Sequence, residues 1–167
     1  MLLIYTGNGK GKTSASVGQA IRAYGQGLTV AFGQFMKRPG QSGEQKLLAA
    51  LLEDRFRACG QGFFKEAAEG EKHRQAAAEL LRWAGEMLAS VDMLVLDEAL
   101  YALGYGLVLQ EELAELAEKA RKDGKHLVLS GRGLPAWLEA EADMVTEMTE
   151  KKHPFAEGRP ASPGIEF

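Results

Sequence analysis

A glycine-rich segment near the start of the chain constrains the fold more than any other feature. Residues 6–13 read Thr-Gly-Asn-Gly-Lys-Gly-Lys-Thr and follow directly on the apolar run 2–5. A phosphate-binding loop joins a buried strand to a helix and ends in Gly-Lys-Ser/Thr, as residues 11–13 do here. Thr6 stands where that motif usually has its first glycine. The segment is therefore a variant of the loop, and it predicts a strand, a tight turn and a helix in that order.

The residue types in this loop suit the binding of a polyphosphate. Glycines allow the positive φ angles that turn successive backbone N–H groups toward an anion, and the following helix adds its positive end. Lys12 would reach between the phosphates as a mobile charge, and the Thr13 hydroxyl would hold a Mg²⁺ ion that the phosphates share. The residues expected to bind ATP or a related nucleotide are Gly7, Asn8, Gly9, Lys10, Gly11, Lys12 and Thr13.

Short apolar runs alternate with segments of helical periodicity along the rest of the chain. The runs lie at 2–5, 28–32, 93–96 and 127–129, with a weaker one at 144–145. Their apolarity is continuous, which is typical of strands buried on both faces of a sheet. Apolar residues at helical spacing occur within 47–52, 77–88 and 113–120. We therefore expect a three-layer α/β fold, a mostly parallel sheet with helices on both faces, with the RecA-like topology of P-loop NTPases.

The length and composition fit one domain. A chain of 167 residues, 46% of them hydrophobic and 26% charged, can bury a sizeable core. We expect a single domain over 1–167. The segment 151–167 carries prolines at positions 154, 160 and 163, which exclude a regular helix there, so we expect an irregular C-terminal tail.

Two carboxylates follow the apolar run 93–96. Asp97 is placed to hold a Mg²⁺ or Mn²⁺ ion opposite Thr13, partly through water. Its neighbour Glu98 would activate water in an ATPase, but its role stays open, because such a base is needed only if water is the nucleophile. Ligands gather at the carboxyl ends of parallel strands. The residues expected to line that edge, because each follows an apolar run, are Gly7, Gln34, Asp97 and Gly131.

Charge and cysteine content argue against several classes of protein. The net charge of −3 is unlike a nucleic-acid-binding surface, which carries an excess of Lys and Arg. Cys59 is the single cysteine and cannot form an internal disulfide. Apolar stretches fall short of the ~20 residues of a membrane span, and the first one is too short for a signal-peptide core. We expect a cytoplasmic protein with small-molecule or protein partners, without nucleic-acid or membrane binding.

The residues alone leave the reaction open. The histidines His73, His126 and His153 have no spacing typical of a metal site or a nucleophile pair. An ATP site without a protein nucleophile suits an enzyme whose substrate is itself reactive. It also suits a phosphotransferase such as a nucleoside kinase, or a nonenzymatic binding protein that a nucleotide switches.

Several segments, in order along the whole chain, resemble the corrinoid adenosyltransferases of the CobA/BtuR type. They include the loop with its unusual Thr6, Gln-Phe-Met-Lys at 34–37, Gly-Glu at 43–44, and Leu-Asp-Glu at 96–98 with Tyr101 downstream. The resemblance continues through Ser-Gly-Arg-Gly at 130–133 and the segments 142–148, 152–155 and 164–167. Enzymes of this family move the adenosyl group of ATP onto the cobalt of a reduced corrinoid.

The resemblance implies a mechanism that needs no protein base. Co(I) attacks C5′ of ATP and tripolyphosphate leaves, so the catalytic residues would be Lys12, Thr13 and Asp97, with Arg132 contacting the nucleotide. Near the corrinoid it implies Gln34, Phe63 and Phe64. Residues 62–65 read Gly-Phe-Phe-Lys where the family often has Gly-Phe-x-Trp, so Phe64 would replace the tryptophan.

The resemblance also implies partners and a cover for the site. It suggests a homodimer and a reduced flavoprotein as electron donor. Some relatives carry an extra N-terminal helix that covers the site, whereas this sequence starts at the first expected strand. The candidates for a cover in this chain are the loop 36–43 and the proline-containing tail.

Overall fold

The computed structural model describes residues 1–62 and 70–167. In these ranges six strands form one sheet in the order β3-β2-β4-β5-β1-β6, and every pairing is parallel. The strands are β1 (Leu2–Thr6), β2 (Val30–Gln34), β3 (Phe56–Ala58), β4 (Met93–Asp97), β5 (His126–Ser130) and β6 (Met144–Glu147). The helices are α1 (Lys12–Gly25), α2 (Gly43–Leu52), α3 (Gly70–Leu88), α4 (Ala99–Gly104), α5 (Gln110–Lys122) and α6 (Ala136–Glu141), with the 3₁₀ turns η1 (Glu53–Arg55) and η3 (Pro154–Glu157).

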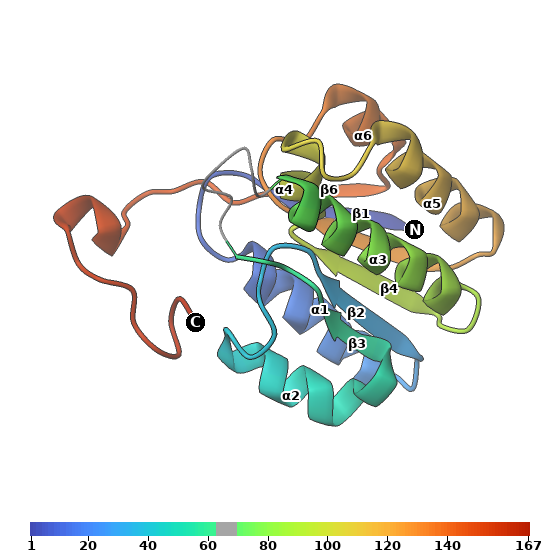
Figure 1. Cartoon of the computed structure of the whole chain (residues 1–167), viewed down its shortest axis with the longest axis horizontal. Helices are drawn as coiled ribbons and strands as arrows, with labels where there is room; N and C mark the ends of the chain where they lie inside the picture. Colours follow the sequence, from blue (N-terminus) through green and yellow to red (C-terminus); the bar gives the residue numbers. More distant parts are fainter. Residues whose placement is uncertain (63–69) are drawn as a thin grey trace.

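The sheet separates two hydrophobic cores. Alternate residues of a strand point to opposite faces, so Leu94 and Leu96 of β4 join the core beneath α3, α4, α5 and α6, while Met93 and Val95 join the core of α1 and α2. Figure 1 shows α1 and α2 on one side of the sheet and α3, α5 and α6 on the other. The expected three-layer α/β fold is confirmed.

Strand order brings the glycine-rich loop and the acidic strand to one edge. β5 lies between β1, which precedes the loop, and β4, which ends in Asp97. Gln34 is the register partner of Asp97, and Tyr5 is the partner of Ser130. Because all these strands are parallel, their carboxyl ends share the edge where the sequence placed its ligand-binding residues.

Three strands differ from the expectation. β2 begins at Val30 rather than at residue 28, and the backbone carbonyl of the preceding Thr29 accepts bonds from the N–H groups of Asp92 and Met93. β3 was not expected, since a three-residue edge strand, Phe56–Ala58, carries no apolar run. The prediction that the strands are buried on both faces is wrong for β6, where Met144 and Val145 are exposed. β6 is the other edge strand of the sheet, and all four of its residues are exposed.

The chain beyond β6 leaves the sheet. The described part of this segment contains the 3₁₀ turn η3 and then turns back, so that the C-terminus comes near the edge that bears the loop (Figure 1). Among residues 1–62 and 70–167, no helix combines the length and the apolarity needed to cross a membrane.

Candidate functional site

The glycine-rich loop takes its shape from contacts with the end of β6. Thr6 is the last residue of β1 and is buried, and its carbonyl accepts a bond from Met148 N at 2.8 Å. The next residue, Gly7, has a positive φ of +98°, and a Cβ there would lie 2.4 Å from Met148 O. A side chain is therefore tolerated at position 6 and excluded at position 7. This explains how Thr6 can replace the usual first glycine.

Lys12 opens helix α1 and folds back over the loop. Its Nζ donates to the carbonyls of Gly7 at 2.8 Å and Gly9 at 2.7 Å. Burial lowers the pKa of Lys12, and the nearby Arg132 guanidinium lowers it further, while Asp97 and Glu98 act in the opposite direction. The Lys12 ammonium therefore lies beside the N-terminus of α1. Backbone N–H groups at the N-terminus of a helix favour the binding of an anion.

Asp97 is a hub of hydrogen bonds at the end of β4. Its carboxylate has no exposed surface and accepts bonds from Ser130 Oγ at 2.6 Å and Gln34 Nε2 at 3.1 Å. Thr13 Oγ1 lies 3.1 Å from both carboxylate oxygens, so the loop threonine and the acidic strand meet as expected. A buried carboxylate needs such partners, because an unpaired one would be strongly destabilising.

Lys37 adds a positive charge to this cluster. Its Nζ lies 3.1 Å from Asp97 Oδ2, 3.1 Å from Thr13 Oγ1 and 3.2 Å from Glu44 Oε1. Burial alone would lower the pKa of Lys37, but the carboxylates of Asp97, Glu98 and Glu44 outweigh it and raise the pKa. Lys37 therefore stays protonated among three acidic side chains.

No role was expected for Lys37, Glu44 or Ser130, although all three lie in segments that resemble the family. Lys37 follows β2, Glu44 lies in the first turn of α2 and Ser130 ends β5, and this position at the ligand-binding edge was the available signal. Gln34 joins the same network, accepting from Gln45 Nε2 at 2.7 Å and donating to Glu44 at 3.1 Å. Gln34 is fully buried in this structure, and its expected place near the corrinoid stays a prediction.

Glu98 has a strained and poorly paired position. Its φ is +64°, which is uncommon for a residue other than glycine, and its Oε2 has no hydrogen-bond partner among the described residues. Burial, and then the charge of Asp97, raise the pKa of Glu98 to about 7 despite Lys37 and bonds from the backbone N–H groups of Met36 and Lys37. This carboxyl changes its charge near neutral pH.

The raised pKa of Glu98 predicts a pH dependence of stability. The folded state holds the Glu98 proton more tightly than the unfolded chain does. The resulting contribution of Glu98 to the free energy of unfolding is complete below about pH 4.5 and is lost as the pH rises through about 7. The loss is on the order of 3 kcal/mol in the free energy of unfolding. Urea unfolding between pH 5 and pH 8 should show the decline in the wild type and a flatter profile in Glu98→Gln. The exposed control Glu111→Gln should keep the wild-type slope, and an equal slope in Glu98→Gln would contradict the assignment.

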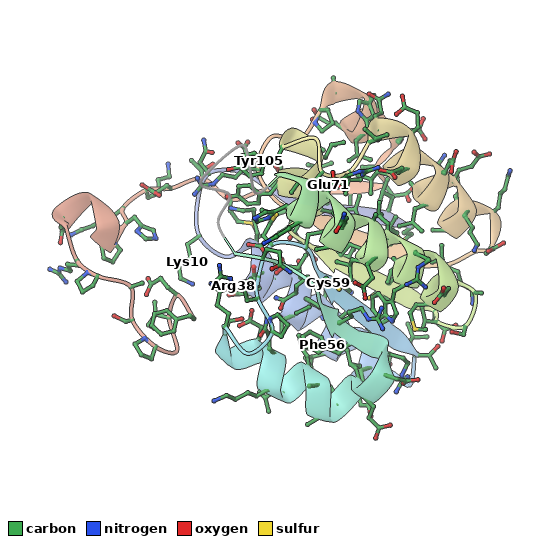
Figure 2. All side chains as sticks on the ribbon, viewed as in Figure 1. Lys10, Arg38, Phe56, Cys59, Glu71 and Tyr105 are labelled. Atoms are coloured by element: carbon green, nitrogen blue, oxygen red, sulfur yellow. The ribbon has the colours of Figure 1, made fainter. Side chains whose placement is uncertain are left out.

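A cavity of about 820 Å³ opens above the loop and the acidic cluster, the name used from here on for Asp97, Glu98 and Glu44 around Lys37. The residues that line it come from the loop and α1, from the segments after β2, β4 and β5, and from the C-terminal tail, including Lys12, Thr13, Lys37, Glu98, Tyr101, Arg132, His153, Ile165 and Phe167. Figure 2 shows Lys10 projecting from the loop toward the side on which the tail turns back. The tail therefore forms one wall of the cavity.

The expected nucleotide-binding residues lie together. Residues 8–13 and Arg132 line the cavity, whereas Gly7 and Asp97 lie beneath it. Arg132 donates to Asn8 O at 3.0 Å, and its guanidinium lies 6.0 Å from the centre of the Tyr101 ring. Phe63 and Phe64 lie outside the described residues.

The oxygen atoms at the loop suit a hard divalent cation. The described residues contain no group of three or more His, Cys, Asp or Glu side chains that could hold a metal ion by itself. The Thr13 hydroxyl and the Asp97 carboxylate meet at 3.1 Å, and the Lys37 ammonium lies 3.1 Å from both of them. Mg²⁺ prefers such a site, with few protein ligands and the remainder from phosphate and water.

The sequence matches the family described as ATP:corrinoid adenosyltransferase BtuR/CobO/CobP over residues 1–167. The chain belongs to this family. A corrinoid adenosyltransferase of Pseudomonas aeruginosa is 38% identical over 172 residues, covering 100% of this chain and 83% of that protein. The corrinoid adenosyltransferase of Escherichia coli K12 and CobA of Salmonella typhimurium are each 35% identical over 169 residues, covering 100% of this chain and 85% of each relative. The chain is thus an enzyme, a transferase of the corrinoid adenosyltransferase family.

A solved structure supports the fold of this adenosyltransferase. The flagellar accessory protein FlaH from Methanocaldococcus jannaschii superposes with a TM-score of 0.56 at 10% identity, over 87% of this chain and 69% of that one. At such an identity the likeness concerns the fold alone. It agrees with the α/β fold class expected from the sequence.

Proposed function

We propose that this enzyme transfers the 5′-deoxyadenosyl group of ATP to the cobalt of a reduced Co(I) corrinoid. The cobalt electron pair forms a bond to C5′, the C5′–O bond breaks, and its electron pair leaves with tripolyphosphate. The observation that carries the proposal is the match to the family over the whole chain, joined to a loop that lines a cavity of about 820 Å³. The nucleophile belongs to the substrate, so the protein needs no base of its own.

The loop residues would act on the leaving group. Negative charge develops on the tripolyphosphate as the C5′–O bond breaks, and preorganised positive groups lower that barrier most. Lys12 Nζ, now held by two loop carbonyls, would turn to the phosphate chain together with the N–H groups at the start of α1. Arg132 lines the same cavity and would contact the nucleotide beside the loop, where it donates to Asn8 O.

The acidic cluster would hold a divalent cation. When bound, Mg²⁺ or Mn²⁺ would neutralise charge on the phosphate chain as a Lewis acid. Thr13 and Asp97 would hold it, Asp97 partly through water. Ser130 and Gln34 fix the Asp97 carboxylate by hydrogen bonds at 2.6 and 3.1 Å, so these two residues would position the ligand rather than contact the substrate.

The remaining assignments concern the corrinoid and the cellular setting. We propose that Phe63 and Phe64 shield one face of the corrin, and that the tail, which already lines the cavity with Ile165 and Phe167, covers the site. The family resemblance supports a homodimer, a reduced flavoprotein as electron donor and a cytoplasmic location for adenosylcobalamin synthesis or salvage.

The products of the reaction test the proposal. Incubation of the full chain with ATP, Mg²⁺ and chemically reduced cobalamin should give a light-sensitive adenosyl product and tripolyphosphate in equal amounts, measured by absorbance and by phosphorus NMR. The same mixture without reductant is the control and should give neither. Formation of ADP in place of tripolyphosphate would show a phosphotransferase and contradict the proposal.

A further inference from the structure

The ammonium of Lys37 occupies the place where a metal ion would be expected. Three oxygens from three different segments converge on it, namely Thr13 Oγ1 at 3.1 Å, Asp97 Oδ2 at 3.1 Å and Glu44 Oε1 at 3.2 Å. The Lys37 side chain is 17% exposed, so little water competes for these contacts. Thr13 and Asp97 are also the oxygens that the proposed function gives to Mg²⁺.

A metal ion and this ammonium cannot share those oxygens. A magnesium ion bound at about 2.0–2.1 Å to Thr13 Oγ1 would lie no farther than about 5 Å from Lys37 Nζ, which is 3.1 Å from the same atom. Two cations so close repel each other strongly where water is excluded. Binding of the metal therefore requires Lys37 to leave.

Only the side chain of Lys37 is free to make that movement. The backbone N–H groups of Met36 and Lys37 donate to the Glu98 carboxylate, and the carbonyl of Met36 accepts from Gly62 N at 3.0 Å. A Cβ at Gly60 would lie 2.0 Å from the carbonyl carbon of Met36, so Gly60 packs directly against this backbone. The flexible four-carbon stem of Lys37 lines the cavity, and rotation about its bonds can carry the charge into that space.

We propose that Lys37 is an internal substitute for the divalent cation. Without nucleotide, its ammonium neutralises the oxygens of Thr13, Asp97 and Glu44 and keeps metal ions out. When the metal arrives with ATP, Lys37 turns into the cavity and places its charge against the phosphate chain. Metal and nucleotide then bind as one unit, because the phosphates receive the displaced charge. This inference rests on the proposed metal site at Thr13 and Asp97.

The binding of Mn²⁺ in the absence of nucleotide tests this exchange. Electron paramagnetic resonance of free Mn²⁺, measured with the full chain and without ATP or corrinoid, should show binding at least about tenfold tighter in Lys37→Met than in the wild type. Lys37→Arg keeps the charge and should bind as weakly as the wild type, as should the exposed control Lys46→Met. Adding Asp97→Asn to Lys37→Met should remove the gain. Equal Mn²⁺ affinity in folded Lys37→Met and wild type would overturn the proposal.

A second measurement needs no variant. In a crystal structure of the wild type with Mg²⁺ and a non-hydrolysable ATP analogue, Lys37 Nζ should lie more than about 4 Å from Asp97, beyond salt-bridge range. An ammonium still at its present 3.1 Å beside a bound metal ion would refute the exchange. Neither experiment involves corrinoid, so a failure of adenosyl transfer would leave both results interpretable.

Discussion

Replacing Lys12 by alanine is expected to lower kcat/KM for adenosyl transfer by about 10²- to 10³-fold. The loop places the Lys12 ammonium 2.8 and 2.7 Å from the carbonyls of Gly7 and Gly9, at the start of α1 and on the wall of the cavity. The variant therefore loses the positive charge at the start of α1 that would act on the departing tripolyphosphate. Steady-state rates with chemically reduced cobalamin and varied ATP measure the effect.

The controls separate chemistry from folding. Lys12→Arg keeps a charge but has a planar head that fits the two carbonyls poorly, so it should recover only part of the rate. Lys46→Ala changes an exposed lysine on α2 and should leave the rate unchanged. The loss in Lys12→Ala should be in kcat as well as KM, because the charge matters most in the transition state. A change in KM alone would show that Lys12 only binds ATP.

Local sequence patterns were sufficient to predict most of the scaffold. The glycine-rich loop, the strand ending in Asp97 and the helices α1, α2, α3 and α5 follow from short segments whose period and end residues are informative by themselves, whereas the six-residue helices α4 and α6 were not expected. Thr6 is an example in which the pattern alone misleads. It departs from the loop motif because residue 6 still belongs to β1, and the left-handed turn begins one residue later, at Gly7.

The acidic cluster could not be predicted in the same way. Lys37 and Ser130 reach Asp97, and Glu44 reaches Lys37, because β4 lies between β2 and β5 and the carboxyl ends of the three strands converge. That order depends on pairing between strands far apart in the sequence. The tail was a candidate cover only through the family resemblance, because residues 151–167 carry no periodic pattern that would place them against the cavity. The position of these side chains depends on contacts between distant segments, which local periodicity does not predict.

Asp97→Asn should lower kcat/KM by about 10²-fold or more and the free energy of unfolding by about 2 kcal/mol. The buried carboxylate accepts bonds from Ser130, Gln34, Thr13 and Lys37, whereas the amide brings two hydrogens into a site already filled with donors. Rates at saturating ATP and Mg²⁺ measure the first effect, and urea unfolding measures the second.

A double-mutant cycle with Lys37→Met identifies the source of the lost stability. Asp97→Asn leaves the Lys37 ammonium without its most buried partner, so the two substitutions together should destabilise the protein by less than the sum of the single effects. Activity should stay low in the double variant, because it lacks the Asp97 carboxylate that would hold the metal, as Asp97→Asn alone does. Strict additivity would mean that Asp97 and Lys37 are not coupled in solution. Wild-type activity in a folded Asp97→Asn would instead remove Asp97 from the metal site, since an amide is a poor substitute for a carboxylate beside a divalent cation.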